Sequence, residues 1–157
     1  MGMNRGNRPW YSWLALVMFI ATISVMLYNV FIRTPKAKQA EAQLEKEFAL
    51  VKPFPQGTAI HSEKSYKDAQ ALLVTTYSTP AGYPVVREHY DSELTRSGWK
   101  FMSERTVNDW GRDLGKNTAH YCKGVWSADL EYMGRETTGG NEDYAIAFGW
   151  HGDQPCK

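Results

Sequence analysis

The chain opens with an uninterrupted apolar run. Residues 10–32 (WYSWLALVMFIATISVMLYNVFI) contain no Asp, Glu, Lys, Arg or His. A helix of that length spans roughly 35 Å, against ~30 Å for the hydrocarbon core of a bilayer. Aromatic residues lie at both ends of the run, where amphipathic rings settle at headgroup depth. The pattern predicts a single N-terminal transmembrane helix over 10–32, preceded by a short cytoplasmic tail over 1–9.

Two other interpretations of the run are weaker. A buried core helix would need partners on every side, which the rest of so short a chain can hardly supply. A cleaved signal peptide has an apolar region of ~7–15 residues, shorter than this one. The small-x-small triplet over 40–42 also lies late for cleavage. We therefore expect an uncleaved signal anchor.

The charges that flank the run are nearly balanced. The basic residues on its two sides are Arg5 and Arg8, then Arg33, Lys36 and Lys38. A short tail with two arginines is the common form of a bacterial-type anchor, and Cys122 and Cys156 could pair in an oxidising compartment. We expect the N-terminus in the cytoplasm and the C-terminal domain on the extracytoplasmic side of the cell inner membrane.

Helical periodicity resumes after the run. Between 36 and 52 the apolar residues recur at spacings of three and four: Ala37, Ala40, Leu44, Phe48 and Val51. Pro35 suits a first helical turn, and Pro53 blocks continuation. Either this helix is a solvated stalk that rests its apolar stripe on the domain, or the stripe is a self-association seam. Two heptads are short for a coiled coil, so we interpret 33–55 as a stalk helix and linker.

The remaining residues, 56–157, predict one extracytoplasmic α+β domain. The predicted strands cover 69–79, 99–107, 119–122, 126–132 and 144–150, and the last two alternate apolar and polar residues. Period two with one apolar face indicates an antiparallel sheet covered on one side. The expected fold is one helix, over 84–97, packed on an antiparallel sheet of four to five strands, with a loop over 108–115 and a flexible connection over 134–141.

The end of that helix carries the clearest local signal. Val86, Tyr90 and Leu94 form one apolar stripe. Gly98 is placed for the left-handed residue just beyond the helix, and Trp99 would then fold back on Leu94. The sequence predicts a Schellman-type helix end.

Composition narrows the function classes. Charged residues make up 22% and the hydrophobic class 43%, so the chain is neither a disordered tail nor a multi-span membrane protein. The formal net charge is +1. A near-neutral chain lacks the basic surface of a nucleic-acid binder.

Catalytic motifs are absent from the sequence. It contains no P-loop, G-x-G-x-x-G, G-x-S-x-G, H-E-x-x-H or C-x-x-C pattern, and we expect no enzymatic activity and no cofactor. The one constellation with chemistry is His120, Cys122, His151 and Cys156. It is compatible with a Cys122–Cys156 disulfide, with two free thiols, or with a zinc site. The disulfide is favoured, because the spacing matches no known zinc finger, so no metal is expected.

Two aromatic residues stand in polar loops with no stripe to join. Trp110 and Tyr83 could each anchor a partner. A loop aromatic can equally well form a lid over the core. We note both as candidate partner-binding residues.

Several segments resemble a loose pattern in small bacterial exported or membrane-anchored domains, mostly of unassigned function. The pattern is proline-glycine, a strand ending Tyr-x-Thr, a helix with Tyr and Leu, and then Gly-Trp. It matches Phe54–Gly57, Val74–Thr79, Glu88–Leu94 and Gly98-Trp99. The resemblance covers about 55–150 and implies an extracytoplasmic α+β module. It carries no catalytic residues over to this chain.

These observations predict a single-pass, membrane-anchored, non-enzymatic protein. Its extracytoplasmic domain would bind a protein partner, as in an envelope assembly, and no nucleic acid. The alternative is a membrane-anchored module that senses or carries a small ligand. A concave cavity with convergent polar groups would favour that alternative, and a solid core would oppose it.

Overall fold

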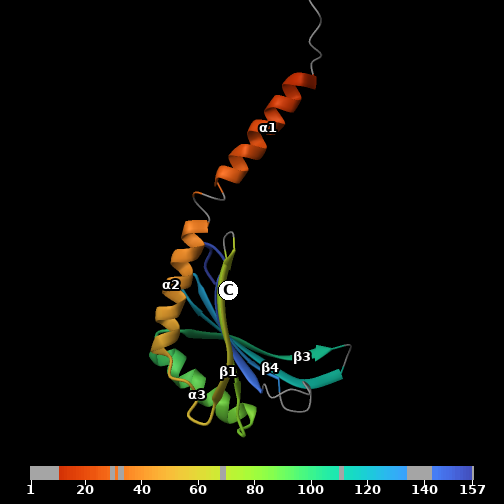
Figure 1. The fold of residues 1–157 in the computed structure, drawn as a ribbon. Helices are drawn as coiled ribbons and strands as arrows, with labels where there is room; N and C mark the ends of the chain where they lie inside the picture. Colours follow the sequence, from red (N-terminus) through yellow and green to blue (C-terminus); the bar gives the residue numbers. More distant parts are fainter. Residues whose placement is uncertain are drawn as a thin grey trace, which may run out of the picture.

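The computed structural model describes residues 11–28, 31, 34–67, 70–109, 112–133 and 143–156. The fold is α+β, with helices packed on a six-stranded antiparallel sheet (Figure 1). In chain order the elements are α1 (Tyr11–Tyr28), α2 (Thr34–Leu50), β1 (Thr58–Lys67), β2 (Gln70–Ser78), α3 (Tyr83–Arg96), β3 (Lys100–Asp109), β4 (Arg112–Lys123), β5 (Trp126–Tyr132) and β6 (Tyr144–Trp150). The strand order across the sheet is β1-β2-β6-β5-β4-β3.

Helix α1 extends away from the sheet (Figure 1). Every side chain from Trp13 to Tyr28 is exposed, although most of them are apolar. Residues 10, 29–30 and 32 of the predicted run lie outside the described residues. Among the residues that the structure describes, no helix has both the length and the apolar character needed to cross a membrane.

Helix α2 packs on the sheet, against β1, β2 and β6. Its buried stripe consists of Ala37, Ala40 and Leu44, which belong to the same core as the strands. The sequence predicted one helix on the sheet, over 84–97, and a stalk helix that rests its apolar stripe on the domain; the structure places both helices on the sheet. The stripe of α2 is therefore covered by the domain within this chain.

The prediction of four to five strands is wrong, because the sheet has six. The additional strand is β1, which pairs antiparallel with β2. All ten of its residues are exposed, so it has no buried face to impose an apolar period on its sequence. It lies at the edge of the sheet, where only one neighbour is needed.

The predicted loop over 108–115 is also wrong. Strand β3 continues to Asp109 and β4 begins at Arg112, and these two residues face each other across the ladder. The register shifts between Val107 and Asn108. The described residues of the predicted loop, 108–109 and 112–115, therefore belong to two paired strands, and residues 110–111 lie outside the described residues.

Helix α3 ends as the sequence predicts. The backbone N–H of Trp99 donates to the carbonyl oxygen of Leu94 at 3.0 Å, and the N–H of Gly98 donates to Thr95 at 3.0 Å. Gly98 has a φ of 87°, a left-handed conformation that costs other residues energy. These two hydrogen bonds are the Schellman pair, so the prediction is confirmed.

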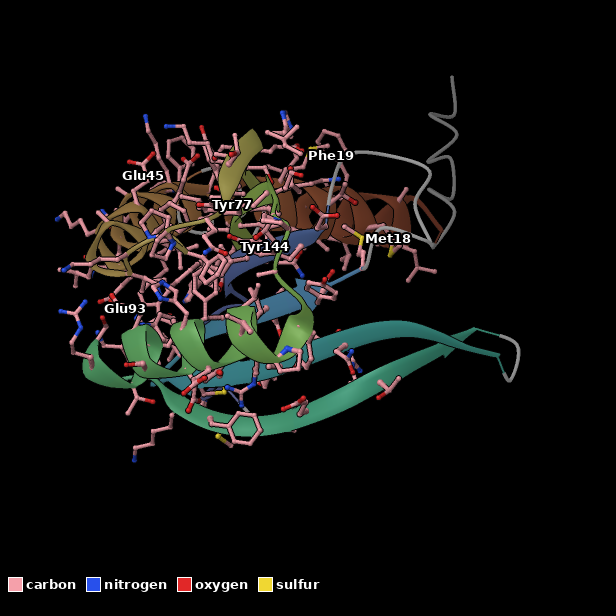
Figure 2. All side chains as sticks on the ribbon, turned by 90° about the horizontal axis from the view of Figure 1, so that it is seen from below. Met18, Phe19, Glu45, Tyr77, Glu93 and Tyr144 are labelled. Atoms are coloured by element: carbon pink, nitrogen blue, oxygen red, sulfur yellow. A yellow bond between two sulfur atoms is a disulfide. The ribbon has the colours of Figure 1, made fainter. Side chains whose placement is uncertain are left out.

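The core lies between the two helices and one face of the sheet. Figure 2 shows Tyr77 and Tyr144 side by side in this layer, and their rings stack with centroids 5.0 Å apart. The hydroxyl groups of Tyr90 and Tyr144 are 3.4 Å apart. Burial raises the pKa of Tyr77 to about 12. These phenols are therefore neutral parts of the packing.

A lysine joins both helices to the sheet. Lys123, at the end of β4, places its Nζ 2.7 Å from a carboxylate oxygen of Glu47 in α2. The same ammonium group donates to the carbonyl oxygen of Ser97 at the end of α3, at 2.9 Å. Glu47 is only 8% exposed, so this charge needs its partner.

Candidate functional site

Polar side chains gather on the sheet face opposite the helices. Across the β4–β5 ladder, His120 lies opposite Asp129, and Cys122 lies opposite Ser127. Across the β3–β4 ladder, Ser103 lies opposite His120. Directly opposed residues share a face of the sheet and have their Cβ atoms close together. Strand pairing therefore collects these side chains from three strands.

A cavity of about 510 Å³ lies over this region. It is bounded by β3, β4 and β5 on one side and by the C-terminal segment 151–156 on the other. Its lining residues are Ser103, Arg105, Thr118, His120, Val125, Ser127, Asp129, His151, Gln154, Pro155 and Cys156. Its volume falls within the range of roughly 300–1,000 Å³ that is usual for small-molecule sites. The sheet face is therefore hollowed where its polar groups converge.

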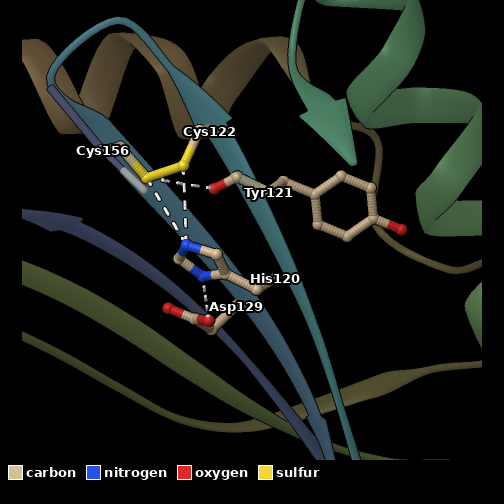
Figure 3. Close-up of a disulfide and its surroundings, with 5 residues drawn as sticks. All are labelled: His120, Tyr121, Cys122, Asp129 and Cys156. Carbon is tan, nitrogen blue, oxygen red and sulfur yellow. Dashed lines mark hydrogen bonds and ion pairs between the residues drawn. A yellow bond between two sulfur atoms is a disulfide. The ribbon is translucent and has the colours of Figure 1, made fainter. Parts of the chain in front are cut away.

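A disulfide fastens the C-terminal segment to the sheet. Cys122 of β4 and Cys156 are bonded, with their Cα atoms 5.5 Å apart (Figure 3). The backbone N–H of Cys156 also donates to the carbonyl oxygen of Gly124 at 3.0 Å. Of the three states that the sequence left open, the structure has the disulfide.

An imidazole and a carboxylate lie directly beside that disulfide. His120 Nδ1 is 2.7 Å from Asp129 Oδ1. The other ring nitrogen, Nε2, is 3.5 Å from the Sγ atoms of both Cys122 and Cys156 (Figure 3). An ionised carboxylate only accepts hydrogen bonds, so it holds a proton on Nδ1. In the neutral ring, Nε2 then presents its lone pair to the two sulfur atoms.

The structure brings together three of the four residues considered for zinc. The donor atoms of His120, Cys122 and Cys156 all lie within 4.8 Å of one another. His151 lines the same cavity but does not belong to that group. No other group of this kind occurs among the described residues.

A glycine that the sequence analysis missed makes room for the cavity wall. A Cβ on Gly149 of β6 would lie 2.8 Å from Ser127 Oγ and 3.3 Å from His151 Nε2. Ala145 and Gly149 are themselves buried, so β6 is covered on both faces and not on one as predicted. A glycine inside an alternating strand often marks a place where another group approaches the backbone closely, so Gly149 could have been identified from the sequence.

The two candidate partner-binding aromatics lie elsewhere. Tyr83 is the first residue of α3 and is not part of a loop. Its hydroxyl group donates to a carboxylate oxygen of Glu104 at 2.7 Å, and its ring lies 5.6 Å from that of Tyr132. Burial, and then this carboxylate, raises the pKa of Tyr83 above its usual value. Trp110 lies outside the described residues.

Comparison with known proteins gives no match to a protein-family model, a curated protein or a solved structure.

Proposed function

We propose that this chain is a single-pass, membrane-anchored, non-enzymatic binding protein of the cell inner membrane. The anchor is the whole charge-free run 10–32, of which α1 is the described part. Apolar side chains from Trp13 to Tyr28 are exposed on all sides of α1. An apolar surface of this extent calls for a cover, and lipid supplies one without a second polypeptide.

The domain is proposed to lie on the extracytoplasmic side. The Cys122–Cys156 disulfide supports this side, since disulfides persist in oxidising compartments and are rare in the cytosol. The short N-terminal tail with Arg5 and Arg8 agrees with this orientation. The domain would then stand close to the outer surface of the membrane, because only residues 29–33 separate α1 from α2.

The open face of the sheet is proposed to bind a protein partner. The observation that carries this proposal is the asymmetry of the sheet. Both helices lie on one face, while the polar cavity at His120 and Asp129 lies on the other. A folded domain with a filled core and one uncovered polar concavity is suited to recognition.

Site-specific photo-crosslinking in native membranes tests the partner. A photoreactive residue replaces Arg105, which lines the cavity. The matched control replaces Glu88, an exposed residue of α3 on the opposite side of the domain. We expect a discrete adduct with one protein from position 105 and none from position 88. Equal labelling at both positions, or no protein adduct at 105, would contradict the proposal.

The cavity itself favours a second candidate, a small-ligand sensing or carrier module. A polar cavity of about 510 Å³ favours this candidate, whereas the filled core of the domain opposes it. Native mass spectrometry of the chain taken from membranes distinguishes the two. A fixed added mass that disappears in Arg105→Ala would support the ligand, whereas a bare chain would favour the protein partner.

A further inference from the structure

We propose that the reduced form of this protein binds a thiophilic divalent cation of the Zn²⁺ type at Cys122, Cys156 and His120. The disulfide and the metal complex would be alternative states of one site. This inference goes beyond the binding function above and does not depend on the membrane or the partner. It rests on the placement of the three donor atoms, which lie within 4.8 Å of one another.

The edges of the donor triangle already suit a tetrahedral ion. With Zn–S near 2.3 Å and Zn–N near 2.0–2.1 Å, neighbouring donors in a tetrahedral site are about 3.5–3.8 Å apart. His120 Nε2 is 3.5 Å from each of the two sulfur atoms. Two of the three edges therefore need no change. Only the edge between the sulfur atoms must open, and reduction of their bond allows this.

Asp129 holds the imidazole in the form that a metal requires. Its carboxylate, 2.7 Å from Nδ1, keeps the proton on that nitrogen and leaves Nε2 as the free donor. Metal-ligating histidines almost always donate their other N–H to such a group. The fourth position opens on the cavity, where His151 or a water molecule could complete the tetrahedron.

The C-terminal segment keeps Cys156 in place when the disulfide opens. The backbone N–H of Cys156 donates to the carbonyl oxygen of Gly124 at 3.0 Å. This contact does not involve sulfur. Cys156 is also partly exposed, so an external reductant can reach it.

The chemistry balances in two steps. A dithiol or phosphine reductant supplies two electrons, and the disulfide takes up two protons to give two thiols. The cation then binds both sulfur atoms as thiolates and releases those two protons, while neutral His120 contributes its lone pair. The divalent ion, its two thiolate ligands and the neutral imidazole together carry no net charge.

Cobalt titration of the full chain tests the proposal. The chain is purified in detergent without a histidine tag, reduced with a phosphine, and titrated with Co²⁺ and then Zn²⁺. We expect one equivalent of Co²⁺ with a thiolate charge-transfer band and the visible bands of tetrahedral coordination, all lost on adding Zn²⁺. The oxidised chain should show neither band. Uptake that is equal in both redox states, no uptake after reduction, or loss of the folded circular-dichroism spectrum on reduction would each overturn the proposal.

Variants locate the site. Cys122→Ser should weaken binding at least 100-fold. If that variant does not fold, Cys156→Ser removes a ligand from outside the sheet with the same expectation. Asp129→Asn should weaken binding about 10–100-fold through His120. The control, Glu131→Gln, removes an exposed carboxylate from the same strand and should change the affinity less than twofold. Equal effects of Asp129→Asn and Glu131→Gln would refute the positioning role, and unchanged binding in both cysteine variants would refute the site.

Discussion

Reduction of the Cys122–Cys156 disulfide should lower the free energy of unfolding by a defined amount. The two cysteines are 34 positions apart in sequence. In the chain-entropy model, a loop of that length costs the unfolded chain about 4 kcal/mol of conformational freedom. The folded state loses little beyond the bond itself, because the hydrophobic core is formed by residues outside the C-terminal segment 151–156. A domain of ordinary stability, about 5–15 kcal/mol, therefore stays folded after reduction.

Urea unfolding of the full chain in detergent, followed by far-UV circular dichroism, measures this loss. The free energy of unfolding with and without a phosphine reductant should differ by about 3–4 kcal/mol. The control is a Cys122→Ala/Cys156→Ala chain, whose stability should equal that of the reduced protein and should not respond to the reductant. A wild-type chain that is equally stable in both conditions would refute the reasoning. Complete unfolding on reduction would also refute it, because the core would then not keep the domain folded without the disulfide.

Three further predictions concern the packing of the domain. Gly98→Val should lower the free energy of unfolding by about 1–2 kcal/mol through left-handed backbone strain alone, since a Cβ there meets only the side chain of Lys123 at 3.7 Å. Gly98→Asn should lower it less. An unchanged urea midpoint for Gly98→Val would be evidence against the Schellman end. Because burial raises the pKa of Tyr77 to about 12, stability is fully present below about pH 10, where unfolded tyrosine begins to ionise, and falls as the pH rises towards 12. Tyr77→Phe should flatten that fall in unfolding titrations at several pH values, and an unchanged pH dependence in this variant would argue against burial of Tyr77 as its cause. Lys123→Met should lower the free energy of unfolding by about 1–3 kcal/mol, because the buried carboxylate of Glu47 loses its cation. Lys64→Met removes one partner of an exposed ion pair and should leave the unfolding midpoint unchanged. Equal losses in the two variants would argue against the bridging role of Lys123.

Elements with a buried face were predicted correctly, because burial gives their sequences a regular spacing of apolar residues. The stripe of Val86, Tyr90 and Leu94 is buried as predicted, and Gly98 ends the helix. The alternation in 126–132 and 144–150 correctly located two central strands. In these elements one face contacts the core, so the sequence records it.

The edge strand and the pairing of distant strands could not be predicted from apolar periodicity. Strand β1 is wholly exposed, so polar residues suit every position and the strand was missed. The β3–β4 hairpin replaced a predicted loop, because turn-forming residues are compatible with either structure. The stripe of α2 was correctly predicted to rest on the domain, but it does not name the strands that cover it, which are β1, β2 and β6.

The cavity depends on register, which the sequence does not state. His120, Asp129 and Cys156 are separated along the chain, and only the β4–β5 pairing and the return of the C-terminal segment bring them together. The sequence did identify His120, Cys122 and Cys156 as a group with chemistry. It gave no sign of Asp129, because a carboxylate on an alternating strand is indistinguishable from a solvated one.

Residues 10–32 are proposed to hold the folded domain on the outer side of a membrane. Carbonate extraction of isolated membranes, combined with protease treatment of intact spheroplasts, is the decisive test. We predict that the chain stays in the carbonate-washed membrane and that external protease removes the domain while the cytoplasmic tail remains protected. Release of the chain by carbonate would show that residues 10–32 do not anchor it, and a domain that resists protease until the membrane is broken would show that the proposed orientation is wrong.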